Sequence, residues 1–250
     1  MSNSAAHSFR SFRLTAKVRE SETINSFFLT PVDDKDWCDF EAGQFLTLRV
    51  PSTDGAMVLR NDKISSSPRE KGHYRITVKR EAGAGADLPP GLCSTWLHDT
   101  MEPGAILEIA PPRGVFTLDR SSSRPVIPLS GGVGLTPMVS MLDLLVHESD
   151  RKVWFIHACE HRSVQVLTEE VEQLAAKYQG ITLHTCYREA EPAEEGGTLP
   201  RYSWGCSVTR RFRRCCRWTI TTSICVGRHP SCRPSIRFCS ALACAGENCL

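Results

Sequence analysis

The pattern of apolar and polar positions changes once along the chain. Up to about residue 112, short segments rich in Val, Ile, Leu, Thr and Phe alternate with turns that contain glycine or proline. Short strands at this spacing predict an antiparallel sandwich or barrel. A short helix is expected over residues 94–101, whose sequence is not strand-like. The expected strands are residues 12–20, 24–32, 44–51, 73–81 and 105–112.

From about residue 124 the spacing becomes that of strands alternating with helices. Pro137 lies near the start of the first expected helix, where its missing N–H costs little. Val171 and Leu174 share one face of the second helix with Ala175 and Tyr178. Such alternation predicts a parallel sheet, so the fold class is β followed by α/β. The expected strands are residues 125–130, 152–158 and 181–187, and the helices are residues 135–149 and about 168–178.

Composition divides the chain a second time. The 250 residues, 41% hydrophobic and with a net charge of +2, suit one large or two small globular domains. Residues 201–250, however, hold nine Arg, one acid (Glu247) and eight of the twelve cysteines, without helix or strand periodicity. We therefore expect an irregular tail. The first residues lack the apolar stretch of a signal peptide and no window is long enough to span a membrane, so a cytoplasmic location without membrane contact is expected.

Three segments carry candidate chemistry. Residues 130–137, Ser-Gly-Gly-Val-Gly-Leu-Thr-Pro, join a strand to a helix, and small residues there let backbone amides approach an anion. A tight turn is the alternative, since Pro137 stands where the last glycine of a dinucleotide fingerprint belongs. Residues 90–94 could bind a second phosphate, or Ser94 could simply be an N-cap. Arg60 could clamp a phosphate, or be a solvated charge in a turn after a strand.

In this order the segments resemble the ferredoxin–NADP⁺ reductase superfamily, near the reductase portion of flavohaemoglobins. The resemblance implies a Greek-key FAD-binding barrel over residues 1–120 and a truncated NAD(P)-binding α/β domain over 121–200. The composition of residues 201–250 marks them as an aberrant Arg/Cys-rich tail. It covers about residues 10–190. The matching segments are residues 41–46, 60–65, 74–81, 91–94 and 130–137.

The resemblance implies hydride transfer from NADH or NADPH to FAD, and onward electron transfer to an unknown acceptor such as a haem or iron–sulfur protein. Arg60 and residues 91–94 would hold the FAD pyrophosphate, the strand segment Val78–Arg80 would line the adenine side, and residues 131–137 would receive NAD(P)H. His157, at the end of a strand, is a cofactor contact or a structural histidine. No catalytic residue is assigned. The expected cofactor-binding residues are Arg60, Asn61, Asp62, Lys63, Ile64, Ser65, Thr77, Val78, Lys79, Gly91, Leu92, Cys93, Ser94, Gly131, Gly132, Val133, Gly134, Thr136, Pro137 and His157.

Two features depart from the family pattern. The family has Arg-x-Tyr-Ser/Thr-x-Ser, with the aromatic ring on the flavin and the hydroxyl near N5, whereas this chain has Asp62 and Lys63 at those positions. The family's C-terminal Cys-Gly-Pro turn, which contacts the nicotinamide, is also absent. These departures leave a catalytically impaired flavin-binding remnant as the alternative function.

The missing turn is present in another reading frame. The coding DNA can be read in a shifted frame from Cys215 onward, in which each new codon consists of the third base of one codon and the first two bases of the next. With allowed third bases, this frame encodes LPLDDYDFYLCGPPSFMQ. Trp218 followed by Thr219 gives aspartate without choice. Our hypothesis is a change of frame between residues 188 and 204, which explains the excess of Arg and Cys. A genuine basic tail is the alternative.

Other functions of the tail are disfavoured by its sequence. Cys215 and Cys216 are adjacent and no C-x-x-C pair occurs, which opposes a zinc site. Cys239, Cys244 and Cys249 lack the spacing of a plant-type iron–sulfur centre. The charge of the tail permits nonspecific nucleic-acid contact, but no recognition module is present. We expect no metal site and no specific nucleic-acid partner.

Overall fold

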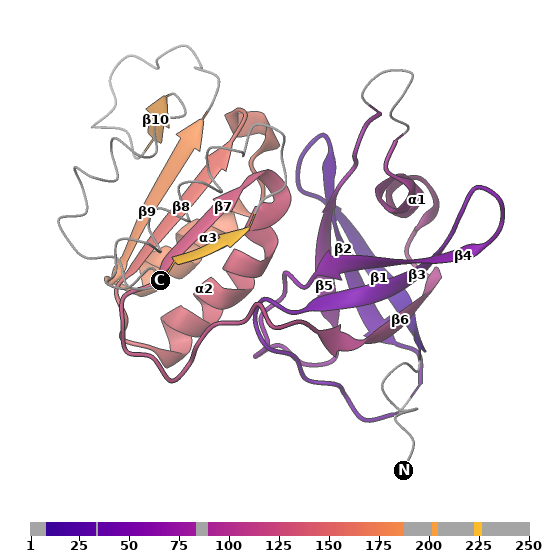
Figure 1. Cartoon of the computed structure of the whole chain (residues 1–250), viewed down its shortest axis with the longest axis horizontal. Coiled ribbons are helices and arrows are strands. Elements are labelled where there is room, and N and C mark those ends of the chain that lie inside the picture. The colour runs from indigo at the N-terminus through magenta and orange to yellow at the C-terminus, as the bar shows by residue number, and fades with distance from the viewer. Residues whose placement is uncertain (1–8, 34, 84–89, 188–201, 205–222, 227–250) are drawn as a thin grey trace, which may run out of the picture. The chain divides into compact units, whose positions relative to one another are not determined.

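The computed structural model describes residues 9–33, 35–83, 90–187, 202–204 and 223–226. The chain forms two compact units and first crosses from one to the other between Leu118 and Asp119. Each unit has its own sheet (Figure 1). No helix in these described ranges is long and apolar enough to cross a membrane.

The first unit contains an antiparallel six-stranded sheet in the order β4-β3-β6-β1-β2-β5. An isolated antiparallel bridge between Ile64, just after β4, and Ile76 in β5 joins the two ends of this order. The inward positions of the strands are fully buried, as Leu46 and Leu48 of β3 illustrate. The predicted barrel is thereby confirmed. Its strands are β1 (Arg10–Arg19), β2 (Ile24–Pro31), β3 (Phe45–Pro51), β4 (Met57–Lys63), β5 (Tyr74–Lys79) and β6 (Ile106–Arg113).

Strand β4 corrects the sequence analysis, which placed Arg60 in a turn after a strand. Arg60 lies within β4, paired with Leu48 of β3. The strand was missed because it lies at the edge of the sheet and most of its residues are exposed, Met57 and Leu59 among them. An edge strand with both faces partly in solvent lacks the alternation of apolar residues that identifies a half-buried strand.

The short helix α1 (Leu92–Thr100) begins two residues earlier than expected. Gly91 is the N-cap, so the interpretation of Ser94 as the N-cap was wrong. Ser94 stands in the first turn instead, where its hydroxyl donates to the Gly91 carbonyl and accepts from the Glu81 amide, both at 3.1 Å. Ser94 thus ties the start of the helix to the end of β5.

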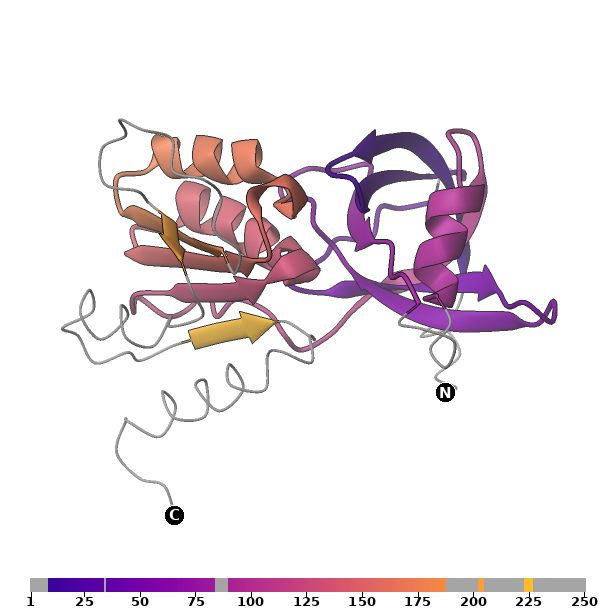
Figure 2. The same ribbon diagram turned by 90° about the horizontal axis from the view of Figure 1, so that it is seen from above.

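The second unit contains a parallel five-stranded sheet in the order β10-β9-β8-β7-β11. Helices α2 and α3 lie on the same side of this sheet (Figure 2), as two right-handed crossovers in one direction require. After β7 the chain builds outward through β8, β9 and β10, and β11 then joins the other side of β7. The elements are β7 (Ile127–Gly131), α2 (Thr136–Glu148), β8 (Val153–Cys159), α3 (Thr168–Lys177), β9 (Ile181–Tyr187), β10 (Tyr202–Trp204) and β11 (Ser223–Val226).

The tail is more regular than its sequence predicts in two places. Strands β10 and β11 lie within residues 201–250 and pair in parallel with β9 and β7. Their Tyr-Ser-Trp and Ser-Ile-Cys-Val segments are short apolar or aromatic runs inside an otherwise aperiodic sequence. The predicted irregularity of the rest of the tail, and its zinc, iron–sulfur and nucleic-acid alternatives, lie outside the described residues.

Candidate functional site

Strand β4 and helix α1 bring the first two candidate segments of the barrel together. Arg60 is exposed, and its Nη1 donates to the neighbouring Leu59 carbonyl at 2.8 Å. Burial raises the pKa of the Cys93 thiol to about 12, with the Asp62 charge acting in the same direction and the Arg60 guanidinium opposing both. The Cys93 sulfur lies 3.9 Å from Asp62 Oδ2, and Arg60 is two residues from Asp62 on the same face of β4, so this face of β4 is turned towards the first turn of α1. Arg60 and that turn were both assigned to the FAD pyrophosphate.

The start of α1 has the geometry of an anion site. The Gly91 amide donates to the Glu81 carbonyl at 3.0 Å. A Cβ added to Gly91 would lie 2.7 Å from Ser94 Oγ and 3.1 Å from Glu81 Cβ, so only glycine fits this turn without displacement. The first amides of a helix have no intrahelical partner and favour negative charge. The first turn of α1 also contains no acidic residue of its own.

Asp62 brings a carboxyl group to the same place. It lies opposite the fully buried Leu46 of β3, on the face of β4 that it shares with Arg60. The Cys93 thiol donates to Asp62 Oδ2 at 3.9 Å. Burial raises the pKa of the half-buried Asp62 to about 6, against a small opposite effect of that hydrogen bond. A carboxylate beside these anion-binding donors opposes a phosphate.

Lys63 faces the other side of β4. Its Nζ donates to the Gly43 carbonyl at 2.5 Å and lies 5.0 Å from the centre of the Phe116 ring and 5.6 Å from that of Phe45. Burial lowers the pKa of this ammonium group. Lys63 is therefore engaged by its own domain. The donors for an FAD pyrophosphate fit, whereas positions 62 and 63 offer the flavin neither a ring nor a hydroxyl group.

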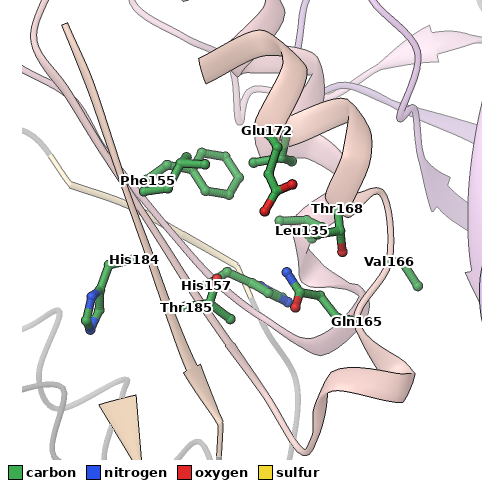
Figure 3. Close-up of a pocket in the computed structure, with 11 residues that line it drawn as sticks. Leu135, Phe155, His157, Gln165, Val166, Thr168, Glu172, His184 and Thr185 are labelled. Atoms are coloured by element: carbon green, nitrogen blue, oxygen red, sulfur yellow. The ribbon is translucent and has the colours of Figure 1, made fainter. Parts of the chain in front are cut away.

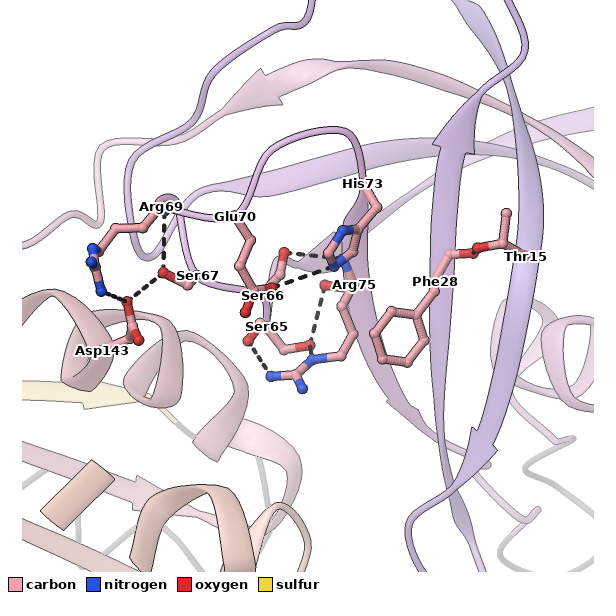
Figure 4. A network of polar contacts seen from close by, with 10 residues as sticks. All are labelled: Thr15, Phe28, Ser65, Ser66, Ser67, Arg69, Glu70, His73, Arg75 and Asp143. Atoms are coloured by element: carbon pink, nitrogen blue, oxygen red, sulfur yellow. Dashed lines mark hydrogen bonds and ion pairs between the residues drawn. The ribbon is translucent and has the colours of Figure 1, made fainter. Parts of the chain in front are cut away.

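Several predicted cofactor-binding residues are buried in the barrel, where their polar groups are hydrogen-bonded to other residues of the same unit. The hydroxyl groups of Ser26, Thr77 and Ser65 form a buried chain, with oxygen separations of 2.7 and 2.8 Å. Arg75 completes it by donating from Nη2 to the Ser65 carbonyl at 2.6 Å and from Nε to Ser65 Oγ at 3.1 Å (Figure 4). Ile64 is fully buried as well. These three predicted residues, Ile64, Ser65 and Thr77, support the strands and direct no free polar group outward.

The remaining barrel candidates are more peripheral. Asn61 is exposed and its Oδ1 accepts from Thr47 Oγ1 at 2.9 Å. Val78 is buried, and its carbonyl lies 2.9 Å from His98 Nε2. Lys79, the last residue of β5, and Leu92, the first of α1, are half-buried. The structure brings together Arg60, Asp62, Cys93 and the start of α1, and leaves Asn61 and Lys63 on the other face of β4.

In the second unit, the glycine-rich segment forms a tight turn between β7 and α2. Gly131 is extended, and Gly132 begins a single 3₁₀ turn that ends at Leu135. Gly132 has φ +52°, and a Cβ placed on it would meet nothing within 4 Å. The turn follows the strand from which the sheet builds in both directions, which is where open α/β sheets bind ligands. The predicted Val133, Gly134, Thr136 and Pro137 lie in this turn and the first turn of α2.

A pocket lies beside this turn (Figure 3). His157 of β8 lines it, is 3% exposed, and shares a 2.9 Å hydrogen bond between Nδ1 and Ser130 Oγ of β7. Burial lowers the pKa of His157 to about 4, so its ring is neutral at physiological pH. Sequence reasoning missed the other polar lining residues, which come from the segment after β8, from the first turns of α3 and from the middle of β9. They are Gln165, Thr168, Glu172, His184 and Thr185.

Comparison with known proteins agrees with this geometry. Residues 11–118 match the family model of the oxidoreductase FAD-binding domain, and residues 129–200 match that of the oxidoreductase NAD-binding domain. The chain is 41% identical over 189 residues to a flavohemoprotein of Halalkalibacterium halodurans, covering 74% of this chain and 45% of that protein. A flavohemoprotein of Bordetella pertussis is 40% identical over 191 residues, covering 76% and 46%. The chain thus spans a little under half the length of these relatives.

Solved structures give the same result. The flavohem-like FAD/NAD binding domain of nitric oxide dioxygenase from Vibrio cholerae has a TM-score of 0.70 and 30% identity, covering 80% of this chain and 79% of that one. The cytochrome b5 reductase domain of Ulva prolifera nitrate reductase has a TM-score of 0.78 and covers 96% and 94%, and at 20% identity it shows the fold alone. This chain belongs to the ferredoxin–NADP⁺ reductase superfamily, as an FAD- and NAD(P)H-dependent oxidoreductase module of the flavohaemoglobin type.

Proposed function

We propose that this chain accepts hydride from NADH or NADPH on FAD and passes the electrons on to a haem protein. The observation that supports the FAD site is the contact between β4 and α1, where Asp62 Oδ2 lies 3.9 Å from the Cys93 sulfur and Arg60 shares the face of β4 with Asp62. An arginine and free helix amides together are suited to a pyrophosphate. When bound, the nicotinamide and the flavin supply the hydride chemistry themselves.

The residues of the chain contribute binding and orientation. Arg60 and the amides at the start of α1 neutralise the FAD diphosphate. Gly132 leaves open space above the turn after β7 for the NAD(P)H diphosphate. His157, held by Ser130, presents a neutral ring to the neighbouring pocket, where it exchanges hydrogen bonds without adding charge.

The limits of the two domains belong to the same proposal. FAD is held by residues 1–120 and NAD(P)H by residues 121–200. Residues 201–250 are translated out of frame. Support comes from β11, whose Ser223–Val226 backbone lies beside β7 where the alternative frame reads Tyr-Leu-Cys-Gly, the start of the CGPP turn. A cytoplasmic location stays a prediction of the sequence.

The acceptor is proposed from the relatives. Those cited are flavohemoproteins, and one similar structure, a phthalate dioxygenase reductase, transfers electrons from pyridine nucleotides to [2Fe-2S]. A haem acceptor follows from the higher sequence identity to the flavohemoproteins. Reduction of an added globin haem by NADH, followed by its absorbance, tests this choice against a [2Fe-2S] protein in the same assay.

Asp62 and Lys63 favour a second candidate function, a flavin-binding protein that no longer accepts hydride. One experiment separates the two. The full chain is purified, loaded with FAD and mixed anaerobically with NADH or NADPH while the flavin absorbance is recorded. Bleaching supports the oxidoreductase, and persistent flavin bands support the binding protein. Absence of FAD binding contradicts both.

A matched pair of arginine variants tests the binding site itself. Arg60→Ala is expected to weaken FAD binding about tenfold or more, because a charge-assisted contact to the diphosphate is lost. Arg13→Ala removes an exposed arginine of β1 from the same domain and is expected to leave FAD binding unchanged. Equal effects of the two substitutions would contradict the assignment of Arg60.

A further inference from the structure

The FAD-binding unit holds a carboxyl group next to the donors that would bind the diphosphate. Asp62 Oδ2 lies 3.9 Å from the sulfur of Cys93, the second residue of α1. Arg60 is two residues away on the same strand and the same face. Both signs of charge are therefore present within one small region, and they act in opposite directions on an anion.

The surroundings of Asp62 make its charge sensitive to protons. Across the strand pair it faces Leu46, which is apolar and fully buried. From α1 it is faced by the Cys93 thiol, which burial keeps protonated. On β4 the neighbouring charges are Arg60 on its own face and Lys63 on the other, where Lys63 is bound to the Gly43 carbonyl. No ion pair joins Asp62 to a basic residue among the described residues.

On this basis we propose that Asp62 is the residue that makes the affinity of this chain for FAD depend on pH, through its charge beside the diphosphate site. The proposal rests on the proposed function. The protonated carboxyl group leaves Arg60 and the amides of α1 free to act on the diphosphate. The ionised group repels the diphosphate at close range in a partly desolvated site. Since burial raises the pKa of Asp62 to about 6, the change falls between mildly acidic and mildly alkaline solution.

The test is a pair of FAD titrations of the full chain, followed by flavin fluorescence at roughly pH 5.5 and roughly pH 8. Wild type is expected to bind FAD about tenfold more tightly at the lower pH, from a unit charge acting on a diphosphate through an intermediate dielectric. Asp62→Asn is expected to bind FAD equally at both pH values, with the affinity that wild type has at the lower one. Asp54→Asn, at an exposed turn carboxylate, is expected to behave as wild type.

Riboflavin is the second probe, because it carries the ring system without the diphosphate. Its binding to wild type is expected to be independent of pH, and this comparison needs no variant, so it decides the matter even if Asp62→Asn does not fold. Three results would each overturn the proposal while leaving FAD binding intact. Wild type could bind FAD equally at both pH values, the Asp62→Asn variant could keep the wild-type pH dependence, or riboflavin could show the same pH dependence as FAD. No FAD binding by wild type at either pH would overturn the proposed function and this inference together.

Discussion

Ser130 Oγ and His157 Nδ1 lie 2.9 Å apart at the carboxyl ends of two adjacent parallel strands, and both side chains are buried. The hydrogen bond fixes the ring of His157, which lines the pocket of the α/β unit. Burial lowers the pKa of this histidine to about 4. The folded chain favours the neutral ring of His157. The stability that the chain gains by keeping this ring neutral is complete above about pH 6.5 and is lost as the pH falls towards 4.

The first prediction concerns that ring. Between roughly pH 7 and roughly pH 4.5, the free energy of unfolding of wild type is expected to fall by about 2 kcal/mol more than that of His157→Gln, because glutamine has no charge to acquire. Urea unfolding at the two pH values measures the difference. His147→Gln, at an exposed position of α2, is the control and is expected to follow wild type. Parallel behaviour of His157→Gln and wild type would contradict the burial of a neutral ring.

Asp62 gives a prediction of opposite sign. Its raised pKa means that the protonated form is favoured in the folded chain, so its contribution to stability is complete below pH 3.8 and is lost as the pH rises through about 6. Without FAD, Asp62→Asn is expected to raise the free energy of unfolding by about 1–2 kcal/mol at roughly pH 8 and to leave it nearly unchanged at roughly pH 4. Denaturant titrations of both proteins at the two pH values provide the measurement. A variant that is less stable than wild type at the higher pH would show that the carboxylate is favourably paired.

The sequence predicted most elements of both sheets, because their inward positions alternate or form continuous apolar runs. It missed β4, since an edge strand needs apolar residues on neither face. It also misplaced the start of α1, where the Ser94 hydroxyl bonds the Gly91 carbonyl and the distant Glu81 amide instead of capping the helix. The candidate site was predictable as a set of segments. The sequence could not predict which of these side chains are available to a cofactor. The burial of Ser65 and Thr77 in one hydroxyl chain depends on the register of β2 and β5 and on the loop after β4.

Gly91 provides the third prediction. Its φ of −61° suits any residue, so the effect of Gly91→Ala depends on space alone. The new Cβ would lie 2.7 Å from Ser94 Oγ, and the displacement of the first turn of α1 is expected to cost about 1–2 kcal/mol of stability and to weaken FAD binding about tenfold. Thermal unfolding and FAD fluorescence titration measure the two effects.

A double-mutant cycle isolates the cause of that effect. In the Ser94→Ala background the closest atom is absent, so adding Gly91→Ala is expected to cost less than it does in wild type. Strictly additive effects would mean that the contact with Ser94 is not what excludes a side chain at position 91, and would leave Glu81 Cβ, at 3.1 Å, as the obstacle.

The last prediction concerns residues 201–250. If the frame changes between residues 188 and 204, a single insertion or deletion in the coding DNA restores the LPLDDYDFYLCGPPSFMQ reading, with its strand at the place that β11 now occupies beside β7. The restored chain is expected to reduce bound flavin with NADH at least about tenfold faster than the present chain, because small errors in placing the reacting groups are costly. The control is a chain that ends at residue 226, which keeps β10 and β11 beside β9 and β7, and it is expected to match the present chain in rate, since the out-of-frame residues beyond it contribute no nicotinamide contact. Anaerobic stopped-flow absorbance at equal FAD occupancy compares the three proteins. If no single insertion or deletion yields the CGPP reading, or if the chain ending at residue 226 is slower than the full chain, the tail is a genuine part of this protein and the frame hypothesis is wrong.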